Sequence, residues 1–429
     1  MENTFFKFCE DLYIKNNQGI LILNNRSNGG WIKISQECFN IINEAINTKK
    51  SKEDVLNGCF DEEDRNYMKL LFSNLYKLGI VENINSKIER KEFSLNEANL
   101  AITSKCNLKC THCCLDLPEN EKTIDPLYDD LIKAIDQIIK CNPKYIIITG
   151  GEPLLRKDIW DLVQYIKNTG NYKLELMTNG TLITEENAKL INNFFESVSI
   201  SIDGYDDESC ERIRGKGVFE KVISNVKILK NYKNLKISLS CISTIDNNKN
   251  YDKFKKLCDD LNVDCLFRRL APAGRAGRNF MELNGNMTTQ CNKQYIKEVN
   301  ECELQMPTDS SISSGLFTTI CDAFKTSITI GSDLCFYPCA ALYMPEFKGI
   351  NITKIDSLKE YLTKKQYMES NAFKLFRSIC FDQTEPCKNC KINFICNSCP
   401  LYVYLYKKYG LLEQYCHDQL LKGDLNIWD

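Results

Sequence analysis

Three closely spaced cysteines are the residues of this sequence best suited to redox chemistry. Cys106, Cys110 and Cys113 form a CX3CX2C run within the segment KCNLKCTHC. A four-iron cluster held by only three protein thiolates leaves one iron open to an exogenous ligand, so the run predicts a reactive cluster rather than a simple electron carrier. Short cysteine spacings also suit zinc, and the run alone leaves that alternative open.

Polar turns follow the strands that are expected after this run. The segment Gly150-Gly151-Glu152-Pro153 comes directly after an apolar strand at 145–148. Glycine lets the backbone approach a ligand closely, and a glutamate can accept a hydrogen bond from an ammonium group. A Thr-Asn-Gly turn at Asn179 and a Ser-Ile-Ser-Ile-Asp-Gly segment end the next two strands. Ser199 and Ser201 alternate with apolar residues, so both are expected to face the same side of their strand.

The order of these motifs resembles that of the radical S-adenosylmethionine (SAM) enzymes. The resemblance implies that Cys106, Cys110 and Cys113 hold a [4Fe–4S] cluster and that SAM binds beside it. A zinc site would leave the polar turns unexplained and is discarded. Residues that the resemblance assigns to SAM are Gly150, Gly151, Glu152 and Pro153 at its amino group, Asn179 and Ser201 on one wall, Arg214 at its carboxylate and His112 near its adenine. For Asp203 two roles stay open, a place in the ligand cavity or the N-cap of the next helix. The implied reaction is hydrogen abstraction from substrate by a 5′-deoxyadenosyl radical.

The second cysteine-rich region resembles the SPASM extension, which holds auxiliary [4Fe–4S] clusters. The matching residues are Cys321, Cys339, Cys387, Cys390, Cys396, Cys399 and Cys416. By that resemblance, Cys387, Cys390, Cys396 and Cys416 hold an outer cluster, and Cys321, Cys339 and Cys399 hold an inner one. Three [4Fe–4S] clusters are therefore expected in all. The sequence departs from the family pattern in the gap between Cys396 and Cys399, which is one residue short, and in Leu334, which replaces a glycine.

The inner auxiliary cluster lacks a fourth ligand in this assignment. Cys335 is one candidate, and an open iron that binds a substrate thiolate is the other. Cys380 has no assigned role. A zinc knuckle over residues 387–399 is the alternative to an outer cluster.

Residues 1–90 are predicted to form a separate small domain. Strands at 19–24 and 31–34 are followed by helices that begin after Ser35, Ser51 and about Asp61, residues that favour helix starts. A short strand at 80–82 is expected to close the domain. This order resembles the RiPP recognition element, a winged-helix-like domain that binds the leader of a ribosomal precursor peptide by adding a strand to a sheet edge. An accessory winged helix without a peptide role is the alternative.

The predicted fold class is α/β. Alternating strands and helices over 98–270 predict a partial (β/α)6 barrel, in which ligands lie at the carboxyl ends of the strands. Residues 271–320 are expected to bridge to a SPASM domain at 321–429. Arg269 and Arg275, near the start of this bridge, are expected at the substrate entrance.

Composition restricts the partners and the compartment. The chain has 429 residues, 55 Lys and Arg against 57 Asp and Glu, and therefore no strong net charge that would favour nucleic acid or an anionic membrane. No signal peptide or membrane-spanning run is found, and the 23 cysteines suit metal binding in a reducing cytoplasm.

Together these resemblances imply a radical SAM/SPASM peptide maturase of the ranthipeptide or sactipeptide type. The expected substrate is a ribosomal precursor peptide with a leader, and the expected electron donor is a flavodoxin or ferredoxin. A cysteine thioether crosslink is the favoured product. Carbon–carbon crosslinking, epimerisation and sulfatase maturation through formylglycine are the alternatives. The sequence does not identify the peptide, the residue attacked, the catalytic base or the oligomeric state.

Overall fold

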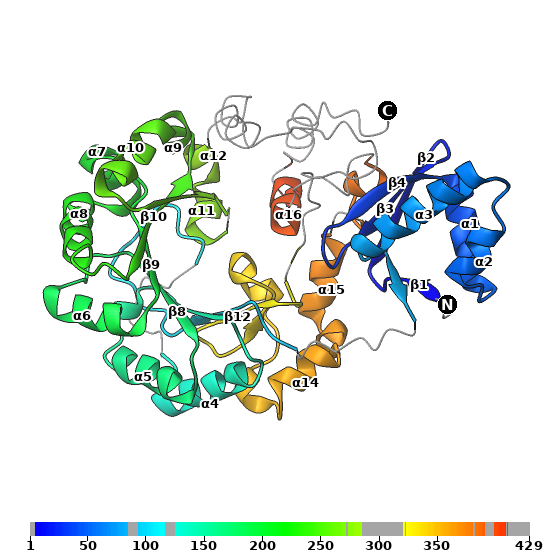
Figure 1. The fold of residues 1–429 in the computed structure, drawn as a ribbon. Coiled ribbons are helices and arrows are strands. Elements are labelled where there is room, and N and C mark those ends of the chain that lie inside the picture. Colours follow the sequence, from blue (N-terminus) through cyan, green and yellow to red (C-terminus); the bar gives the residue numbers. More distant parts are fainter. Residues whose placement is uncertain are drawn as a thin grey trace.

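A computed structural model of the chain describes residues 5–84, 93–115, 125–271, 273–284, 321, 323–380, 382–390, 399–408 and 410. The proposed ligands Cys396 and Cys416 lie outside these residues, as do positions 285–320 of the bridging region. The described residues form an N-terminal domain, a large α/β sheet and a C-terminal segment that joins both (Figure 1).

The N-terminal domain combines two small antiparallel sheets with three helices. Strands β2, β3 and β4 form one sheet in that order, and β1 pairs with β5 in the other. The elements are β1 (Phe6–Phe8), β2 (Leu12–Asn17), β3 (Ile20–Asn25), β4 (Trp31–Ser35), α1 (Gln36–Asn47), α2 (Lys52–Asn57), α3 (Glu62–Lys77) and β5 (Val81–Asn83). The three strands and three helices predicted from the sequence are present, the third strand as β5, and β1 and β2 are additional.

Side-chain caps explain where these helices begin. The Ser35 hydroxyl accepts from the Cys38 N–H at the start of α1, and the Asp61 carboxylate accepts from the Asp64 N–H at the start of α3. Ser51 and Asp54 form a reciprocal capping box at α2, as their spacing predicts. Buried apolar residues such as Phe72 and Leu75 of α3 then pack against the strands to form the core of the domain.

The central sheet has eight strands in the order β11-β10-β9-β8-β7-β6-β12-β13. Its first six strands in sequence are all parallel, which confirms the predicted βα succession. They are β6 (Glu97–Ala101), β7 (Tyr145–Thr149), β8 (Lys173–Thr178), β9 (Ser197–Ser201), β10 (Lys236–Ser243) and β11 (Asp264–Arg269). Helices cover the outer face of the curved sheet (Figure 1). These are α4 (Tyr128–Ile139), α5 (Ile159–Thr169), α6 (Glu185–Phe194), α7 (Asp207–Arg214), α8 (Val218–Leu229), α9 (Ile245–Lys249) and α10 (Tyr251–Leu261).

Two strands of the sheet come from the region expected to be a separate extension. Strand β12 (Ser327–Ile330) pairs in parallel with β6, and β13 (Phe336–Tyr337) pairs antiparallel with β12. Strand β12 has only four residues, and its partner β6 lies far away in the sequence, so local patterns did not mark it as part of this sheet. The six-stranded sheet expected from the sequence is therefore extended by two strands.

Short helices make up the remaining described parts. They are α11 (Gly274–Arg278), α12 (Phe280–Asn284), α14 (Leu358–Thr363), α15 (Asn371–Ser378) and α16 (Pro400–Lys408). Single 3₁₀ turns are η1 (Pro153–Leu155), η2 (Ala340–Leu342), η3 (Pro345–Phe347), η4 (Ile352–Lys354), η5 (Gln366–Glu369) and η6 (Cys387–Asn389). In Figure 1, α15 and α16 lie between the central sheet and the N-terminal domain.

Ion pairs connect the N-terminal domain to the C-terminal segment. Arg26 Nη1 lies 3.1 Å from Asp382 Oδ2, which also receives the Arg377 guanidinium. Lys325 Nζ lies 3.8 Å from Asp11 Oδ2. The contacts bring the predicted peptide-binding domain next to the cysteine-rich segment. Within the described residues, no helix has the length and apolar character that spanning a membrane requires.

Candidate active site

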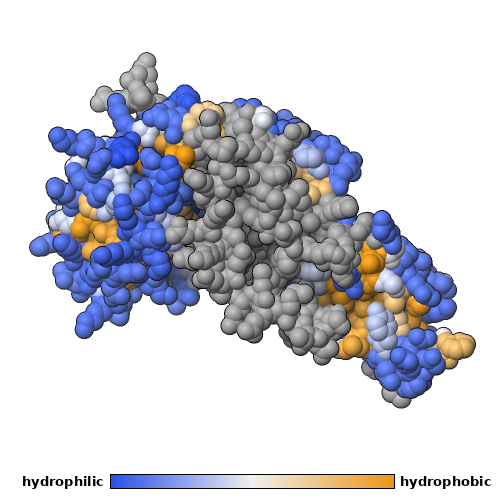
Figure 2. Space-filling view, turned by 90° about the horizontal axis from the view of Figure 1, so that it is seen from above, coloured by the Kyte–Doolittle hydropathy of each residue, from blue (hydrophilic) through white to orange (hydrophobic). Residues whose placement is uncertain are grey.

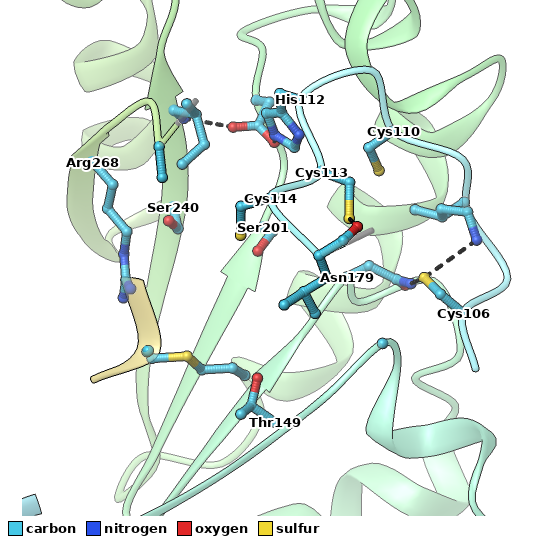
Figure 3. A pocket seen from close by; sticks show the side chains of 18 of the residues that line it. Cys106, Cys110, His112, Cys113, Cys114, Thr149, Asn179, Ser201, Ser240 and Arg268 are labelled. Carbon is cyan, nitrogen blue, oxygen red and sulfur yellow. Dashed lines mark hydrogen bonds and ion pairs between the residues drawn. The ribbon is translucent and has the colours of Figure 1, made fainter. Parts of the chain in front are cut away.

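A cavity of about 300 Å³ opens at the carboxyl ends of the parallel strands. Its wall includes most of the residues that the sequence singled out: Cys106, Cys110, His112, Cys113, Gly150, Gly151, Asn179, Ser201 and Arg214 (Figure 3). Ser199, Arg269 and Arg275 also line it, as their positions in the sequence predict. Glu152 and Pro153 are buried and are not among the lining residues.

The loop that carries the three cysteines is held by backbone hydrogen bonds from neighbouring segments. The Gly151 N–H donates to Thr103 O at 2.9 Å, and the Glu152 N–H donates to Lys105 O at 2.8 Å. On the other side, the Ala276 N–H donates to Cys113 O at 3.1 Å. The segment after β11, which looked like a linker in the sequence, therefore fixes the cysteine loop.

The two glycines of the Gly-Gly-Glu-Pro turn are required by this packing. A Cβ atom on Gly150 would lie 2.4 Å from Thr103 O, and one on Gly151 would lie 2.2 Å from Lys105 O. The backbone that approaches these glycines most closely is that of the cysteine loop. The glycines thus position the cysteines in addition to forming part of the cavity wall.

Glu152 connects two strand ends behind the wall. Its carboxylate accepts from the Thr178 hydroxyl and the Asn179 N–H, both at 2.7 Å, and from the Leu154 N–H at 3.1 Å. Burial raises the pKa of this carboxyl, whereas the three hydrogen bonds oppose the increase. Within the described residues, Glu152 therefore orients the β7 and β8 turns.

The thiols of Cys106 and Cys110 lie near hydrogen-bond donors. Cys106 Sγ is 3.4 Å from the Leu108 nitrogen and 4.0 Å from Asn179 Nδ2. Cys110 Sγ is 3.8 Å from Arg214 Nη1. Burial raises the pKa of both thiols, that of Cys110 to about 11, and the Arg214 charge counteracts part of the increase at Cys110. Donors at these positions stabilise sulfur that carries negative charge.

Asp203 is a buried acceptor that sequence reasoning did not settle. Its carboxylate accepts hydrogen bonds from Arg214 Nε at 2.6 Å, from the His112 imidazole and from the Ile242 N–H. Burial would raise the pKa of Asp203, but the charges of Arg214 and His112 hold that pKa well below its usual range. Asp206, and not Asp203, caps α7. Asp203 thus fixes Arg214 and His112, two residues assigned to SAM, within the cavity wall.

Three buried polar atoms of the wall have no hydrogen-bond partner within the described part of the chain. They are His112 Nδ1, Arg275 Nε and Thr329 Oγ1, and all three residues line the cavity. Burying such atoms without partners is unfavourable, so their presence fits a cavity that binds a polar molecule. Thr329 belongs to β12 and could not have been placed here from the sequence motifs.

No group of three or more His, Cys, Asp or Glu side chains in the described ranges surrounds a single metal-ion position. Cys106, Cys110 and Cys113 instead lie around one end of a larger cavity (Figure 3). A tetrahedral zinc site needs its ligands around one ion, whereas an iron–sulfur cluster binds its cysteines at separate irons.

The family model described as the Radical SAM superfamily matches residues 100–261. The chain contains a radical SAM domain. The matched residues include the cysteine loop and the ends of β6 to β10, whereas Arg268, Arg275 and Thr329 of the cavity wall lie outside them.

Two curated relatives each match about two fifths of this chain. The mycofactocin maturase MftC of Mycolicibacterium smegmatis is 31% identical over 175 residues, which are 41% of this chain and 44% of that protein. The AdoMet-dependent heme synthase of Oleidesulfovibrio alaskensis is 32% identical over 181 residues, 41% of this chain and 46% of that protein. The chain thus spans less than half the length of these two relatives.

Solved structures show the fold over more of the chain. Streptococcus suis SuiB bound to precursor peptide SuiA matches 94% of this chain and 97% of that chain, with 16% identity and a TM-score of 0.54. The structure described as anSMEcpe with bound AdoMet matches 76% of this chain and 97% of that chain, with 21% identity and a TM-score of 0.51. The radical SAM α/β fold is therefore confirmed.

Proposed function

We propose that this chain is a radical SAM maturase that modifies a ribosomally made precursor peptide. The observation that carries the proposal is a SAM-type cavity lined by the three-cysteine loop in a chain that also has a separate N-terminal domain. A fold shared with SuiB over 94% of the chain supports a peptide substrate, because SuiB is bound to a precursor peptide in that structure.

In this proposal the cavity wall holds the cofactors. Cys106, Cys110 and Cys113 bind a [4Fe–4S] cluster, and SAM lies against Gly150, Gly151, Asn179 and Ser201. When bound, the reduced cluster and SAM supply a 5′-deoxyadenosyl radical that takes a hydrogen atom from the substrate.

The side chains around the cysteines orient these groups and control charge. Arg214 brings a guanidinium to Cys110 and is held there by Asp203, so negative charge on the sulfur is partly balanced. Instead of contacting Cys110, the Arg214 guanidinium can pair with the SAM carboxylate from the same position in the cavity wall. The unpartnered His112 Nδ1 is available for a polar group of the bound molecule.

The N-terminal domain is proposed to hold the leader of the peptide. In the described residues the sheet has the order β2-β3-β4, so β2 and β4 are its edge strands, the kind of element to which a peptide strand adds. Apolar side chains are exposed on this domain, including Ile41, Phe60, Tyr67 and Leu70, and Figure 2 shows hydrophobic surface there. Such surface suits the apolar residues of a peptide.

The C-terminal segment is proposed to be a SPASM domain with two auxiliary [4Fe–4S] clusters. The outer cluster uses Cys387 and Cys390, which are described, together with Cys396 and Cys416, which lie outside the described residues. The inner cluster uses Cys321, Cys339 and Cys399. A cytoplasmic location and a flavodoxin or ferredoxin as electron donor belong to the same proposal, because the clusters need a reduced environment.

A thioether between a peptide cysteine and a carbon atom is the favoured product. Its formation removes one hydrogen atom from carbon, one proton from the thiol and one electron, which an auxiliary cluster accepts. Carbon–carbon crosslinking involves the same loss of hydrogen and keeps the thiol. Oxidation of a cysteine or serine to formylglycine is the remaining alternative from the sequence analysis.

Mass spectrometry separates these outcomes. The reconstituted protein is incubated with SAM, dithionite and a candidate cysteine-containing precursor, with the Cys110→Ala variant as control. Loss of two hydrogen atoms together with the free thiol supports the thioether, the same loss with the thiol retained supports a carbon crosslink, and a product that reacts with hydrazine supports formylglycine. Absence of 5′-deoxyadenosine from fully loaded protein contradicts the radical SAM reaction.

Leader binding is tested on the full chain and on a variant that begins after residue 84. Fluorescence anisotropy of a labelled leader gives the affinity, and uncoupled 5′-deoxyadenosine formation shows whether the truncated protein still assembles its cavity. The proposal requires that truncation abolishes leader binding. Unchanged leader affinity in the truncated protein contradicts it.

A further inference from the structure

The cavity of the candidate active site has a second end, away from the cysteine loop. In Figure 3, Cys106 and Cys110 lie on one side of the cavity and Arg268 lies on the other, with Ser201 and Ser240 between them. SAM is proposed to lie beside the cysteines, so the end at Arg268 is the part of the cavity that remains for the substrate. No motif of the sequence assigned a role to Arg268.

The cavity wall carries an excess of positive charge. The ionisable side chains that line it, apart from the cysteines and a tyrosine, are those of His112, Asp203, Arg214, Arg268, Arg269 and Arg275. Asp203 is the only carboxylate among these described residues, and it already accepts hydrogen bonds from Arg214 and His112. The other three guanidinium groups therefore have no carboxylate partner in the described part of the wall.

Arg268 extends from the edge strand of the sheet towards its interior. The residue lies beside Ile242 of β10 near the end of β11, and its Nη2 is 3.4 Å from Ser199 Oγ on β9, two strands away. Glu175 of β8 lies behind the wall, where burial raises the pKa of its carboxyl and the charge of Arg268 opposes that increase. Glu175 thus offsets part of the Arg268 charge, but it does not line the cavity and a ligand would not meet it.

Two further polar atoms of the wall lack hydrogen-bond partners among the described residues. They are Thr329 Oγ1 and Arg275 Nε, and both are buried. Thr329 is only 2% exposed and belongs to β12, near the opposite edge of the sheet from β11. Leaving a buried hydroxyl unpaired is unfavourable, and a bound polar group would remove that penalty. This observation indicates a polar ligand independently of the charges.

The two other arginines are carried by segments with contacts of their own. The Arg269 guanidinium lies 5.6 Å from the ring centroid of Tyr402 on α16. Arg275 belongs to α11, which is tied to the cysteine loop by the hydrogen bond from the Ala276 N–H to Cys113 O. Both add positive charge to the wall beyond that of Arg268.

We propose that this end of the cavity binds a carboxylate of the substrate peptide and that Arg268 pairs with it. The inference rests on the proposed function, because it takes a peptide to be the substrate. An unmodified ribosomal peptide offers carboxylates on aspartate and glutamate side chains and at its C-terminus, and a guanidinium can pair with either through two parallel N–H donors. The pair holds the neighbouring part of the peptide between SAM and Arg268, which makes Arg268 a specificity-determining residue.

The test uses full-length protein with reconstituted clusters and saturating SAM, so that the SAM site is occupied. Isothermal titration calorimetry measures the binding of three tripeptides. Ac-Gly-Asp-Gly-NH2 carries a side-chain carboxylate, Ac-Gly-Asn-Gly-OH carries a terminal carboxylate and Ac-Gly-Asn-Gly-NH2 carries neither. The variants are Arg268→Gln, Arg268→Lys and Arg268→Glu, and Arg212→Gln, which changes an exposed arginine of α7 outside this cavity, is the matched control. SAM affinity and uncoupled 5′-deoxyadenosine formation are measured for each protein.

The proposal expects at least one carboxylate peptide to bind about tenfold more tightly than the neutral peptide, and the peptide that does so identifies the source of the carboxylate. Arg268→Gln should abolish this preference, and Arg268→Lys should retain part of it because the charge is kept. Arg268→Glu should instead favour Ac-Gly-Lys-Gly-NH2, a reversal that a loss of structure does not produce. Arg212→Gln should bind all peptides as the unchanged protein does.

The proposal is overturned if the three tripeptides bind equally or not at all, or if Arg268→Gln keeps the preference. It is also overturned if Arg268→Gln weakens SAM binding as strongly as peptide binding, because Arg268 then serves the cofactor. Absence of 5′-deoxyadenosine from the unchanged, fully loaded protein contradicts the proposed function itself. Formation of 5′-deoxyadenosine together with equal binding of the tripeptides contradicts only the carboxylate site.

Discussion

Replacing Asp203 by asparagine should destabilise the central sheet strongly. Asp203 is fully buried, and Arg214, which it contacts, is only 9% exposed. The substitution keeps the shape of the side chain but leaves the guanidinium buried without its counter-charge. Removing one partner of a buried ion pair typically costs about 3–5 kcal/mol, so we expect a decrease of that size in the free energy of unfolding.

Urea unfolding of the metal-free protein measures this effect. Trp160 of α5 stacks on Phe194 within the sheet's helical layer and reports on the central domain when Trp31 and Trp428 are replaced by phenylalanine. If the free energy of unfolding decreases by about 3 kcal/mol per molar urea, the midpoint of the unfolding transition should fall by about 1–2 M urea.

A double-mutant cycle separates the ion pair from other effects. The double variant Asp203→Asn/Arg214→Leu should lose less free energy of unfolding than the two single variants lose in sum, and the difference should exceed about 1 kcal/mol. The reason is that the double variant leaves neither charge of the pair buried without its partner. Asp206→Asn, which keeps the N-cap of α7, is the matched control and should be nearly neutral. The reasoning is refuted if Asp203→Asn lowers the free energy of unfolding by less than about 0.5 kcal/mol, or if the effects of the two single substitutions simply add up in the double variant.

Three further changes test other contacts. Gly151→Ala places a methyl group against the cysteine loop and should abolish iron binding by the SAM-type cluster, whereas Gly58→Ala, with only ordinary contacts, should leave iron content unchanged. Arg26→Ala removes the partly buried ion pair with Asp382 and should increase hydrogen exchange in the N-terminal domain's strands; equal exchange would mean that the pair contributes nothing to docking. Phe324→Ala removes the central ring of an aromatic cluster and should lower the free energy of unfolding by about 3–5 kcal/mol, measured by thermal or urea unfolding. A decrease below about 1 kcal/mol would contradict this packing.

The sequence predicted the parts of the fold that have strong local signals. The parallel strands β7 to β11 and the helix caps at Ser35 and Ser51 follow from apolar runs and capping residues, and both are confirmed. The cavity could be placed because its motifs end successive parallel strands. Strand β12 was missed because it has only four residues, and nothing in its sequence indicates that it pairs with the distant strand β6.

Contacts between distant segments could not be predicted from local patterns. The pairing of Asp203 with Arg214 depends on how α7 returns to the strand end, and no motif specifies it. The same holds for the ion pair of Arg26 with Asp382, whose residues come from the N-terminal domain and the C-terminal segment.

The pairing of β12 with β6 affects how the protein is made. Asn99 and Thr329 are register partners in the sheet although more than half of the chain separates them. A ribosome therefore releases β6 long before its neighbour exists, and during that time one edge of the sheet has unpaired backbone groups. Pairings between such distant segments form slowly. The matched domain at 100–261 ends before β12, so expressing it alone would leave that edge permanently open to association with other chains.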